Sequence, residues 1–124
     1  MGFMISAPDG RTLRVNAWNW RPTLQLLADH GVLDGETVEL LGYNGATRVS
    51  AQQSERIARF LDAYVAALPI DSRVMLDGSV TAEPDTGEFY RKAEEMHLNY
   101  SVQREWLVEF RDFCRSSEAG FSVG

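Results

Sequence analysis

At 124 residues, with 44% hydrophobic and 24% charged residues, the chain suits a single domain over residues 1–124 and excludes an extensively disordered protein. Its net charge of −6 disfavours binding to nucleic acid or to an anionic membrane, because phosphates repel an acidic protein, and favours a basic partner. The single cysteine excludes an internal disulfide. With neither a secretory signal pattern nor an apolar run of about 20 residues, we expect a cytoplasmic protein without a membrane span.

The first sixteen residues predict a β-hairpin. Residues 3–7 and 12–16 have the pattern of strands, and the Pro8-Asp9-Gly10-Arg11 segment lies between them. Asp-Gly between two alternating segments is a strong signal for a tight turn. We therefore expect two antiparallel strands at the start of the chain.

Two tryptophans, Trp18 and Trp20, stand two positions apart in NAWNW at residues 16–20. In a strand-like segment their side chains point to the same side. A buried tryptophan removes about 150–250 Å² from water, which stabilises a fold by about 4–6 kcal/mol before entropy, so we expect at least one of them in the core. Exposure of one as an interface anchor is the alternative, since tryptophan is enriched at binding hot spots. Trp20 is the candidate for that contact.

A helix and a strand are expected next. In RPTLQLLADHGV, residues 21–32, Pro22 suits the first helical turn and Gly31 the position just after the helix. ETVELLGY, residues 36–43, has the pattern of a short strand. The segment Gly42–Gly45 stands where a phosphate-binding loop would follow a strand, but it lacks the third glycine and the lysine of such loops, so we expect a tight turn.

Residues 50–68 predict the clearest helix of the chain. Ser50 and Gln53 have the spacing of a capping box, and Pro69 ends the segment. The apolar positions recur at i, i+3, i+4 and i+7, which places them on one buried face. These positions are Ile57, Phe60, Leu61, Tyr64, Val65 and Leu68.

A strand and a long polar excursion are expected after this helix. SRVMLDGSVT, residues 72–81, has the pattern of a strand broken at Asp77-Gly78. Residues 82–100 are mostly polar, with one helical turn expected near residues 91–96. A structureless segment of that length inside a compact domain is typically functional or mobile.

Ser101 is expected to cap a final helix over residues 102–114, and the residues after Gly120 are expected to return as a strand. Strands and helices are intermixed but too few for a doubly wound sheet. The sequence therefore predicts an α+β fold, in which an N-terminal β-hairpin and a few further strands pack on about three helices. The apolar stripe of the final helix comprises Val102, Trp106, Leu107, Phe110, Phe113 and Cys114.

The reactive side chains do not assemble into a catalytic motif. Asp85-Thr86-Gly87 matches the aspartic-protease triplet, but its polar neighbours indicate a turn. Cys114 shares a stripe with aromatic residues, so we expect a core position rather than a nucleophile paired with His30 or His97. The two histidines lack the spacing of metal ligands. We therefore assign no catalytic residue, no metal and no cofactor.

Acidic residues concentrate between residues 71 and 95, where seven acids against three bases give a local charge of −4. A solvated loop is the simplest interpretation, and a contact surface for a cationic partner is the functional one. General acid–base work by a pair of these carboxylates is a further alternative. The candidate partner-binding residues are Asp77, Glu83, Asp85, Glu88, Glu94, Glu95 and Trp20.

Four stretches together resemble a group of small single-domain bacterial proteins: VNAWNWRPTLQLL, ELLGYN, MLDGSVT and REWLVEFRDFC. The resemblance covers most of the chain and implies no activity, cofactor or site. Small acidic α+β proteins of this kind are similar to immunity proteins, which bind and neutralise a secreted toxin. This second likeness is an analogy of size and charge only.

Two hypotheses on function stay open. The first is a protein-binding domain, in the form of an immunity-type inhibitor of a basic toxin or a binder of another cationic partner. The alternative is a small enzyme or ligand-binding domain, with its pocket where NAWNW, the Gly42–Gly45 turn and the helix caps meet. We favour the first, because the acids cluster and no catalytic motif accompanies them. The sequence predicts no oligomeric state.

Overall fold

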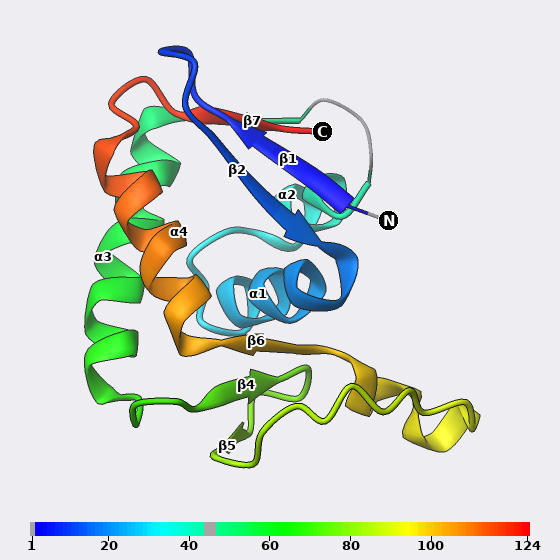
Figure 1. Ribbon diagram of the computed structural model, residues 1–124. Coiled ribbons are helices and arrows are strands. Elements are labelled where there is room, and N and C mark those ends of the chain that lie inside the picture. Colours follow the sequence, from blue (N-terminus) through cyan, green and yellow to red (C-terminus); the bar gives the residue numbers. More distant parts are fainter. Residues whose placement is uncertain (1, 44–46) are drawn as a thin grey trace.

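The computed structural model describes residues 2–43 and 47–124, and it confirms the α+β fold. In these residues, seven strands form two antiparallel sheets, and the helices pack against and between them (Figure 1). None of the described helices combines the length and apolar content needed to cross a membrane. The elements are β1 (Gly2–Ser6), β2 (Thr12–Asn16), α1 (Ala17–Asp29), α2 (Gly35–Leu41), β3 (Thr47–Val49), α3 (Ala51–Ala67), β4 (Arg73–Met75), β5 (Val80–Thr81), the 3₁₀ helix η1 (Ala93–Asn99), β6 (Ser101–Gln103), α4 (Arg104–Ser116) and β7 (Phe121–Val123).

The first sheet has the strand order β2-β1-β7-β3 and joins both ends of the chain. β1 and β2 form the predicted hairpin, in register from Gly2 opposite Asn16 to Ser6 opposite Thr12. The C-terminal strand β7, also predicted, lies between β1 and β3 and pairs with both. Gly120 makes the entry to β7 possible, because its φ is +80° and a Cβ there would collide with the Val49 carbonyl oxygen.

The second sheet has the order β5-β4-β6. The predicted strand over 72–81 is a two-stranded hairpin, because the expected break at Asp77-Gly78 is its turn and Gly78 has a φ of +89°. β6 pairs with the other side of β4, with Val74 opposite Val102. This sheet is short, and it lies below α1 at the opposite end of the molecule from the first sheet (Figure 1).

The longest helix, α3, confirms the prediction for residues 50–68. The Ser50 hydroxyl accepts from the Gln53 backbone N–H at 3.1 Å, and the Gln53 side chain accepts from the Ser50 N–H at 2.9 Å, so the capping box is complete. α3 and α4 lie against one another along one side of the molecule (Figure 1). Their mutual packing is also fixed by Ser54, whose buried hydroxyl donates to the Cys114 carbonyl at 2.8 Å.

The strand predicted over residues 36–43 is wrong, because residues 35–41 form helix α2. Asp34 starts this helix by accepting from the Thr37 N–H at 2.7 Å, and Glu36 in the first turn interacts favourably with the helix dipole. Leu41 is buried, whereas Leu40 is 50% exposed, so the apolar pair does not mark a buried strand. Gly42 caps the C-terminal end of α2, and residues 44 and 45 of the predicted Gly42–Gly45 turn lie outside the described residues.

Helix α1 begins earlier than the sequence predicts. The Asn16 side chain accepts from the Asn19 N–H at 2.9 Å and starts the helix at Ala17, so NAWNW is its cap and first turn rather than a strand-like segment. Pro22 consequently lies inside the helix and not in its first turn. The predicted end is confirmed, since Gly31 follows the helix with a φ of +66°.

Ser101 does not cap the final helix. It belongs to β6, and α4 begins at Arg104 after Gln103, which makes no side-chain capping bond. The Ser101 carbonyl accepts from the Asn19 side-chain amide at 2.7 Å, which ties β6 to the start of α1. Val102 accordingly lies in the strand, while the rest of the predicted apolar stripe lies on α4.

The core includes buried residues of the helices and of both sheets, and α4 supplies its aromatic centre. Phe110 packs edge-on against Trp20, with ring centroids 5.6 Å apart, and against Phe121 at 6.1 Å. Cys114 is buried beside this group, as predicted, so it fills space in the core. Burial raises the pKa of its thiol to about 12.

This pKa predicts a loss of stability at high pH. Between pH 9 and 12 the unfolded chain, with a thiol of ordinary pKa 9.0, releases a proton that the folded chain retains. The free energy of unfolding therefore falls as the pH rises through this window, by about 1 kcal/mol at pH 10. Urea denaturation at pH 8 and pH 10 should show a smaller decrease for Cys114→Ala than for the parent chain. Burial also raises the pKa of Tyr64, but Tyr64 is present in both proteins and lowers the free energy of unfolding of both. Equal decreases in the parent chain and in Cys114→Ala would therefore contradict the prediction.

Candidate partner-binding groove

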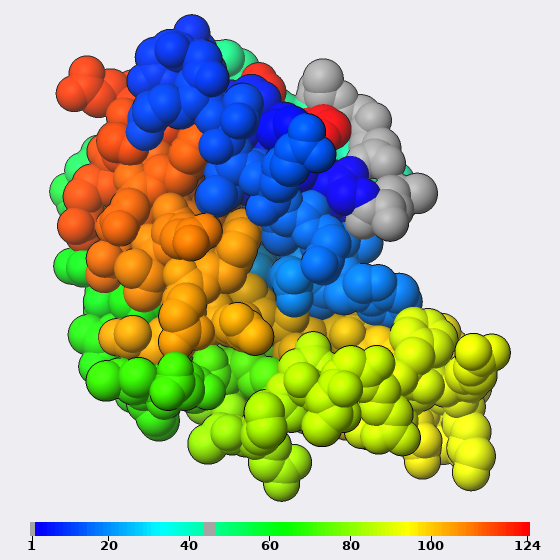
Figure 2. Space-filling view, in the orientation of Figure 1, coloured from blue at the N-terminus to red at the C-terminus, as the bar shows by residue number. Residues whose placement is uncertain are grey.

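Residues 82–92, which we call the arm, connect β5 to η1 without helix or strand. The arm contains three of the candidate acids and is exposed along most of its length. In the space-filling view it projects as a ledge below the beginning of α1 (Figure 2). One end is attached by Arg73 on β4, whose Nε donates to the Glu83 carbonyl at 2.9 Å.

Asn99, the last residue of η1, holds the other end of the arm. Its side-chain amide donates to the Tyr90 carbonyl at 2.9 Å and accepts from the Tyr90 N–H at 2.8 Å. These two hydrogen bonds satisfy the backbone N–H and C=O groups of Tyr90, as pairing with a neighbouring strand would do. The arm is therefore attached to the rest of the protein at Glu83 and at Tyr90, and the residues between these two points connect them.

We expect Asn99→Ala to loosen the arm without unfolding the protein. The variant loses both bonds to the Tyr90 backbone, so the Tyr90 amide should exchange with solvent at least tenfold faster in hydrogen-exchange NMR. The free energy of unfolding should change by less than about 1 kcal/mol, because the arm contributes no buried residue to the core. Gln52→Ala, on the exposed surface of α3, is the control. Unchanged exchange at Tyr90 would show that the arm is held by other contacts.

An aromatic cluster lies where the arm meets the start of α1. Trp18 packs edge-on against Phe89 of the arm, with ring centroids 5.4 Å apart, and its ring is tilted by 49° against that of Tyr100, with centroids 4.8 Å apart. The Arg21 guanidinium lies over the ring of Tyr100, 5.0 Å from the ring centroid. Trp18 and Phe89 nevertheless remain 37% and 50% exposed, so a partner can still contact both rings.

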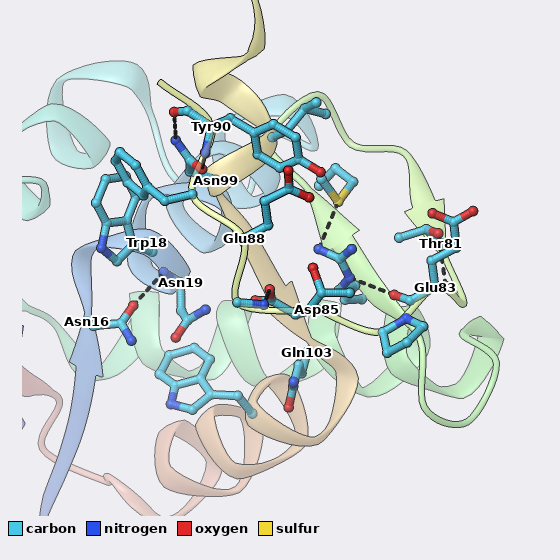
Figure 3. Close-up of a pocket in the computed structure, with 18 residues that line it drawn as sticks. Asn16, Trp18, Asn19, Thr81, Glu83, Asp85, Glu88, Tyr90, Asn99 and Gln103 are labelled. Carbon is cyan, nitrogen blue, oxygen red and sulfur yellow. Dashed lines mark hydrogen bonds between the residues drawn. The ribbon is translucent and has the colours of Figure 1, made fainter. Parts of the chain in front are cut away.

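A groove of about 840 Å³ runs between the arm and the body of the protein. Figure 3 shows Asn16, Trp18 and Asn19, from the start of α1, on one side of it, and Glu83 and Asp85 of the arm across from them. Gln103 and Trp106 line it from the junction of β6 and α4. The groove is therefore built by segments from three distant parts of the sequence.

The groove carries negative charge. Its charged lining comprises three carboxylates, Glu83, Asp85 and Glu88, and one guanidinium, Arg73, which gives a net charge of −2. The Arg73 donors are engaged by the Glu83 carbonyl, the Met75 sulfur and the Ser101 hydroxyl rather than by carboxylates. The negative charge is therefore available to a ligand in the groove.

Among the described residues, no salt bridge joins a candidate acid to one of the protein's own bases. Across residues 2–43 and 47–124, the ion pairs join Asp9 to Arg11, Glu55 to Arg59, and the acids Asp62 and Asp112 to the two arginines of α4, Arg111 and Arg115. None involves the six candidate acids. Unpaired carboxylates raise the local negative potential and attract a basic partner.

The structure divides the six predicted acids into two sets. Glu83, Asp85 and Glu88 line the groove, whereas Asp77, Glu94 and Glu95 do not. Asp77 accepts from the hydroxyl and the backbone N–H of Ser79 in the β4–β5 turn, and these bonds lower its pKa. Its local role is thus the turn, while Glu94 and Glu95 lie on η1 beyond the arm.

The placement of Trp20 at a contact surface is wrong. Because residues 17–29 are helical, Trp18 and Trp20 point to different sides, and Trp20 points inward, where it is 1% exposed. Its Nε1 donates to the Leu41 carbonyl at 2.9 Å. Trp18 is the exposed member of the pair and the one that lines the groove. The expectation that at least one tryptophan lies in the core is confirmed.

Trp106 is a groove residue that the sequence assigned to the core alone. Its ring stacks on Phe110, with centroids 5.1 Å apart, and also lines the groove. It further lines a second hollow of about 680 Å³, which shares Asn16, Asn19 and Trp106 with the groove. Its Nε1 is buried and finds no hydrogen-bond acceptor among the described residues. The only feature of the sequence that could have indicated this role was the position of Trp106 at the N-terminal end of the helical stripe.

The other reactive side chains lie away from the groove or are engaged locally. Cys114 is buried, and His30 caps α1 with its Nδ1 3.0 Å from the Leu26 carbonyl. The Asp85-Thr86-Gly87 triplet is an exposed turn, in which the Asp85 side chain accepts from the Gly87 N–H at 3.0 Å. Within the described part of the chain, no group of three or more histidine, cysteine or acidic side chains is placed to hold a metal ion.

No family model, curated protein or solved structure matches the chain. The resemblance to small bacterial proteins therefore stays a prediction.

Proposed function

We propose that this chain is a protein-binding domain that recognises a basic partner through the arm and the groove beneath it. One observation carries the proposal: Glu83, Asp85 and Glu88 face a large groove and form no ion pair with the described residues. Because the three carboxylates line the same groove, one bound partner can contact all of them. Complementary charge on a partner speeds association and fixes its orientation.

An immunity-type inhibitor of a basic toxin is the specific form of this function that the size and charge of the chain suggest. In this proposal the protein acts in the cytoplasm and does not bind nucleic acid, since its net charge of −6 repels phosphates. Asp77, Glu94 and Glu95 extend the negative surface beyond the groove and steer the partner toward it.

Affinity capture from a native lysate at 50 mM and 500 mM NaCl tests this proposal. The immobilised chain should retain a basic protein at low salt and release most of it at high salt, because the contacts are ionic. A chain carrying Glu83→Gln, Asp85→Asn and Glu88→Gln should not retain that protein, while the control Glu109→Gln/Glu118→Gln, on exposed residues of another surface, should. Equal retention by the two variants would refute the proposed role of the groove acids.

The groove also supports a second candidate function, a small-molecule-binding domain or enzyme. Its volume lies in the range of ligand pockets, and Asn16, Trp18 and Asn19 of the NAWNW segment line it. The expected position beside the Gly42–Gly45 turn is not that of the groove, because Ala17, Trp20 and Gly42 line a separate hollow of about 620 Å³. A thermal-shift screen of small cationic and neutral metabolites separates the candidates. A compound that stabilises the parent chain but not Trp18→Ala would favour the second.

A further inference from the structure

The groove has the dimensions of a site for a chain segment rather than for an ion. Its volume of about 840 Å³ is near the upper end of the roughly 300–1,000 Å³ of pockets that enclose whole ligands. The second hollow shares Asn16, Asn19 and Trp106 with the groove and is also lined by Phe3 and Arg14 of the β1–β2 hairpin. The two hollows together suit an extended peptide.

The groove combines aromatic faces with carboxylates, which favours arginine over lysine. Trp18 and Phe89 are partly exposed, and Asp85 and Glu88 belong to the same arm as Phe89. A planar guanidinium stacks on an aromatic ring while its donors fork onto a carboxylate, whereas an ammonium acts as a point charge. The protein already places guanidinium groups over aromatic rings, with Arg21 over Tyr100 at 5.0 Å and Arg11 over Phe113 at 5.3 Å.

Trp106 adds an argument for a peptide over a simple cation. Its buried Nε1 has no acceptor among the described residues, and it belongs to a side chain that lines both hollows. A buried donor without an acceptor is unfavourable, and an acceptor brought by a ligand would remove that cost. A peptide carbonyl is such an acceptor, whereas metal ions and polyamines carry none.

From these observations, and resting on the proposed function, we propose that the groove binds an extended arginine-containing segment of the partner protein. The arginine side chain lies against Trp18 and Phe89 with its guanidinium paired to Asp85 or Glu88. The backbone of the segment continues past Trp106 toward the second hollow. Specificity for arginine comes from the aromatic walls, and charge complementarity supplies the orientation.

A titration followed by ¹⁵N–¹H NMR tests this inference on the intact chain. The probes are blocked hexapeptides of alternating alanine and arginine, the same peptide with lysine, the same with glutamate, and spermine as a cation without a peptide. The three tryptophan indole signals, assigned with Trp18→Phe and Trp20→Phe, report the place of binding. We expect the arginine peptide to shift the Trp18 and Trp106 indoles and the backbone of 83–90, and to bind at least fivefold more tightly than the lysine peptide. Trp20, hydrogen-bonded to Leu41 in the core, should shift least.

Two charge variants separate a groove site from a merely acidic surface. Asp85→Asn/Glu88→Gln should weaken arginine-peptide binding at least tenfold, whereas Glu94→Gln/Glu95→Gln, which changes the net charge equally outside the groove, should weaken it less than twofold. Three results would overturn this inference and leave the proposed function standing. The first is an equal loss of affinity in the two variants, and the second is an equal affinity for the arginine peptide and for the lysine peptide or spermine. The third is a chain that captures a basic partner but binds no peptide. Failure of both the peptides and the basic partner to bind would refute the proposed function itself.

Discussion

Neutralising Asp85 and Glu88 together should weaken binding of the captured basic partner at least 30-fold, equivalent to about 2 kcal/mol of binding free energy. The two carboxylates line the groove and have no ion-pair partner in the described part of the chain. Their charge can therefore attract a basic ligand in the groove. Asp85→Asn keeps the oxygen that accepts from the Gly87 N–H, and Glu88→Gln keeps the side-chain volume, so the arm should retain its shape. Surface plasmon resonance at 50 mM NaCl measures the change.

The kinetics of this variant distinguish steering from contact. Loss of steering lowers the association rate and disappears at high salt, whereas loss of a paired contact raises the dissociation rate at any salt. We expect both effects, with the larger share in dissociation. Glu109→Gln/Glu118→Gln, with the same change in net charge, should alter only the association rate and by less than threefold. A loss below threefold for Asp85→Asn/Glu88→Gln would contradict the groove as the binding site.

Trp20→Ala should have the largest effect on stability among the changes considered, a loss of about 3–5 kcal/mol in the free energy of unfolding. The side chain is 1% exposed and its ring contacts Phe3, Trp106 and Phe110. Truncation leaves a cavity at the aromatic centre of the core, and it removes the hydrogen bond that the Trp20 Nε1–H donates to the Leu41 carbonyl. Urea denaturation followed by far-UV circular dichroism measures the loss.

Two related variants allow this prediction to be tested even if Trp20→Ala does not fold. Trp20→Phe keeps most of the ring but removes the bond to Leu41, so it should lose about 1–2 kcal/mol and remain folded. Trp18→Ala should lose less than about 1 kcal/mol, because Trp18 lies at the surface, yet it should abolish most partner binding. If Trp18→Ala destabilised the protein more than Trp20→Phe, the assignment of one tryptophan to the core and the other to the groove would be wrong.

The elements that follow local rules could be predicted from the sequence. The hairpin turn and the capping box at Ser50 each depend on residues within a few positions, and each is confirmed. The strand after Gly120 is confirmed as well, although its pairing partners are the distant strands β1 and β3. Residues 36–43 were assigned to the wrong element because Val38, Leu40 and Leu41 allow either period in so short a segment. The Asp34 cap decides the outcome in favour of helix.

The tryptophan pair shows how a boundary error changes a functional prediction. With α1 started at Pro22, Trp18 and Trp20 would share a side. With α1 started at Ala17 by the Asn16 cap, Trp20 turns into the core and Trp18 toward the arm. Asn followed three residues later by Asn was the available signal for the earlier start.

The groove could be predicted only in part. The acidic excursion was recognisable as a charge cluster, but its position opposite Asn16 and Asn19 depends on contacts across the chain. Asn19 binds the Ser101 carbonyl and Asn99 binds the Tyr90 backbone. Neither contact leaves a mark in local composition, so the sequence could indicate the charge of the site and not its shape.

Hydrogen–deuterium exchange on the complex with the captured basic partner tests the central claim most directly. If the partner occupies the groove, peptides that cover residues 16–19 and 83–90 should exchange more slowly in the complex than in the free chain, while α3 remains unchanged. Protection confined to the exposed faces of α2 or α3, with the arm exchanging as in the free protein, would contradict the account.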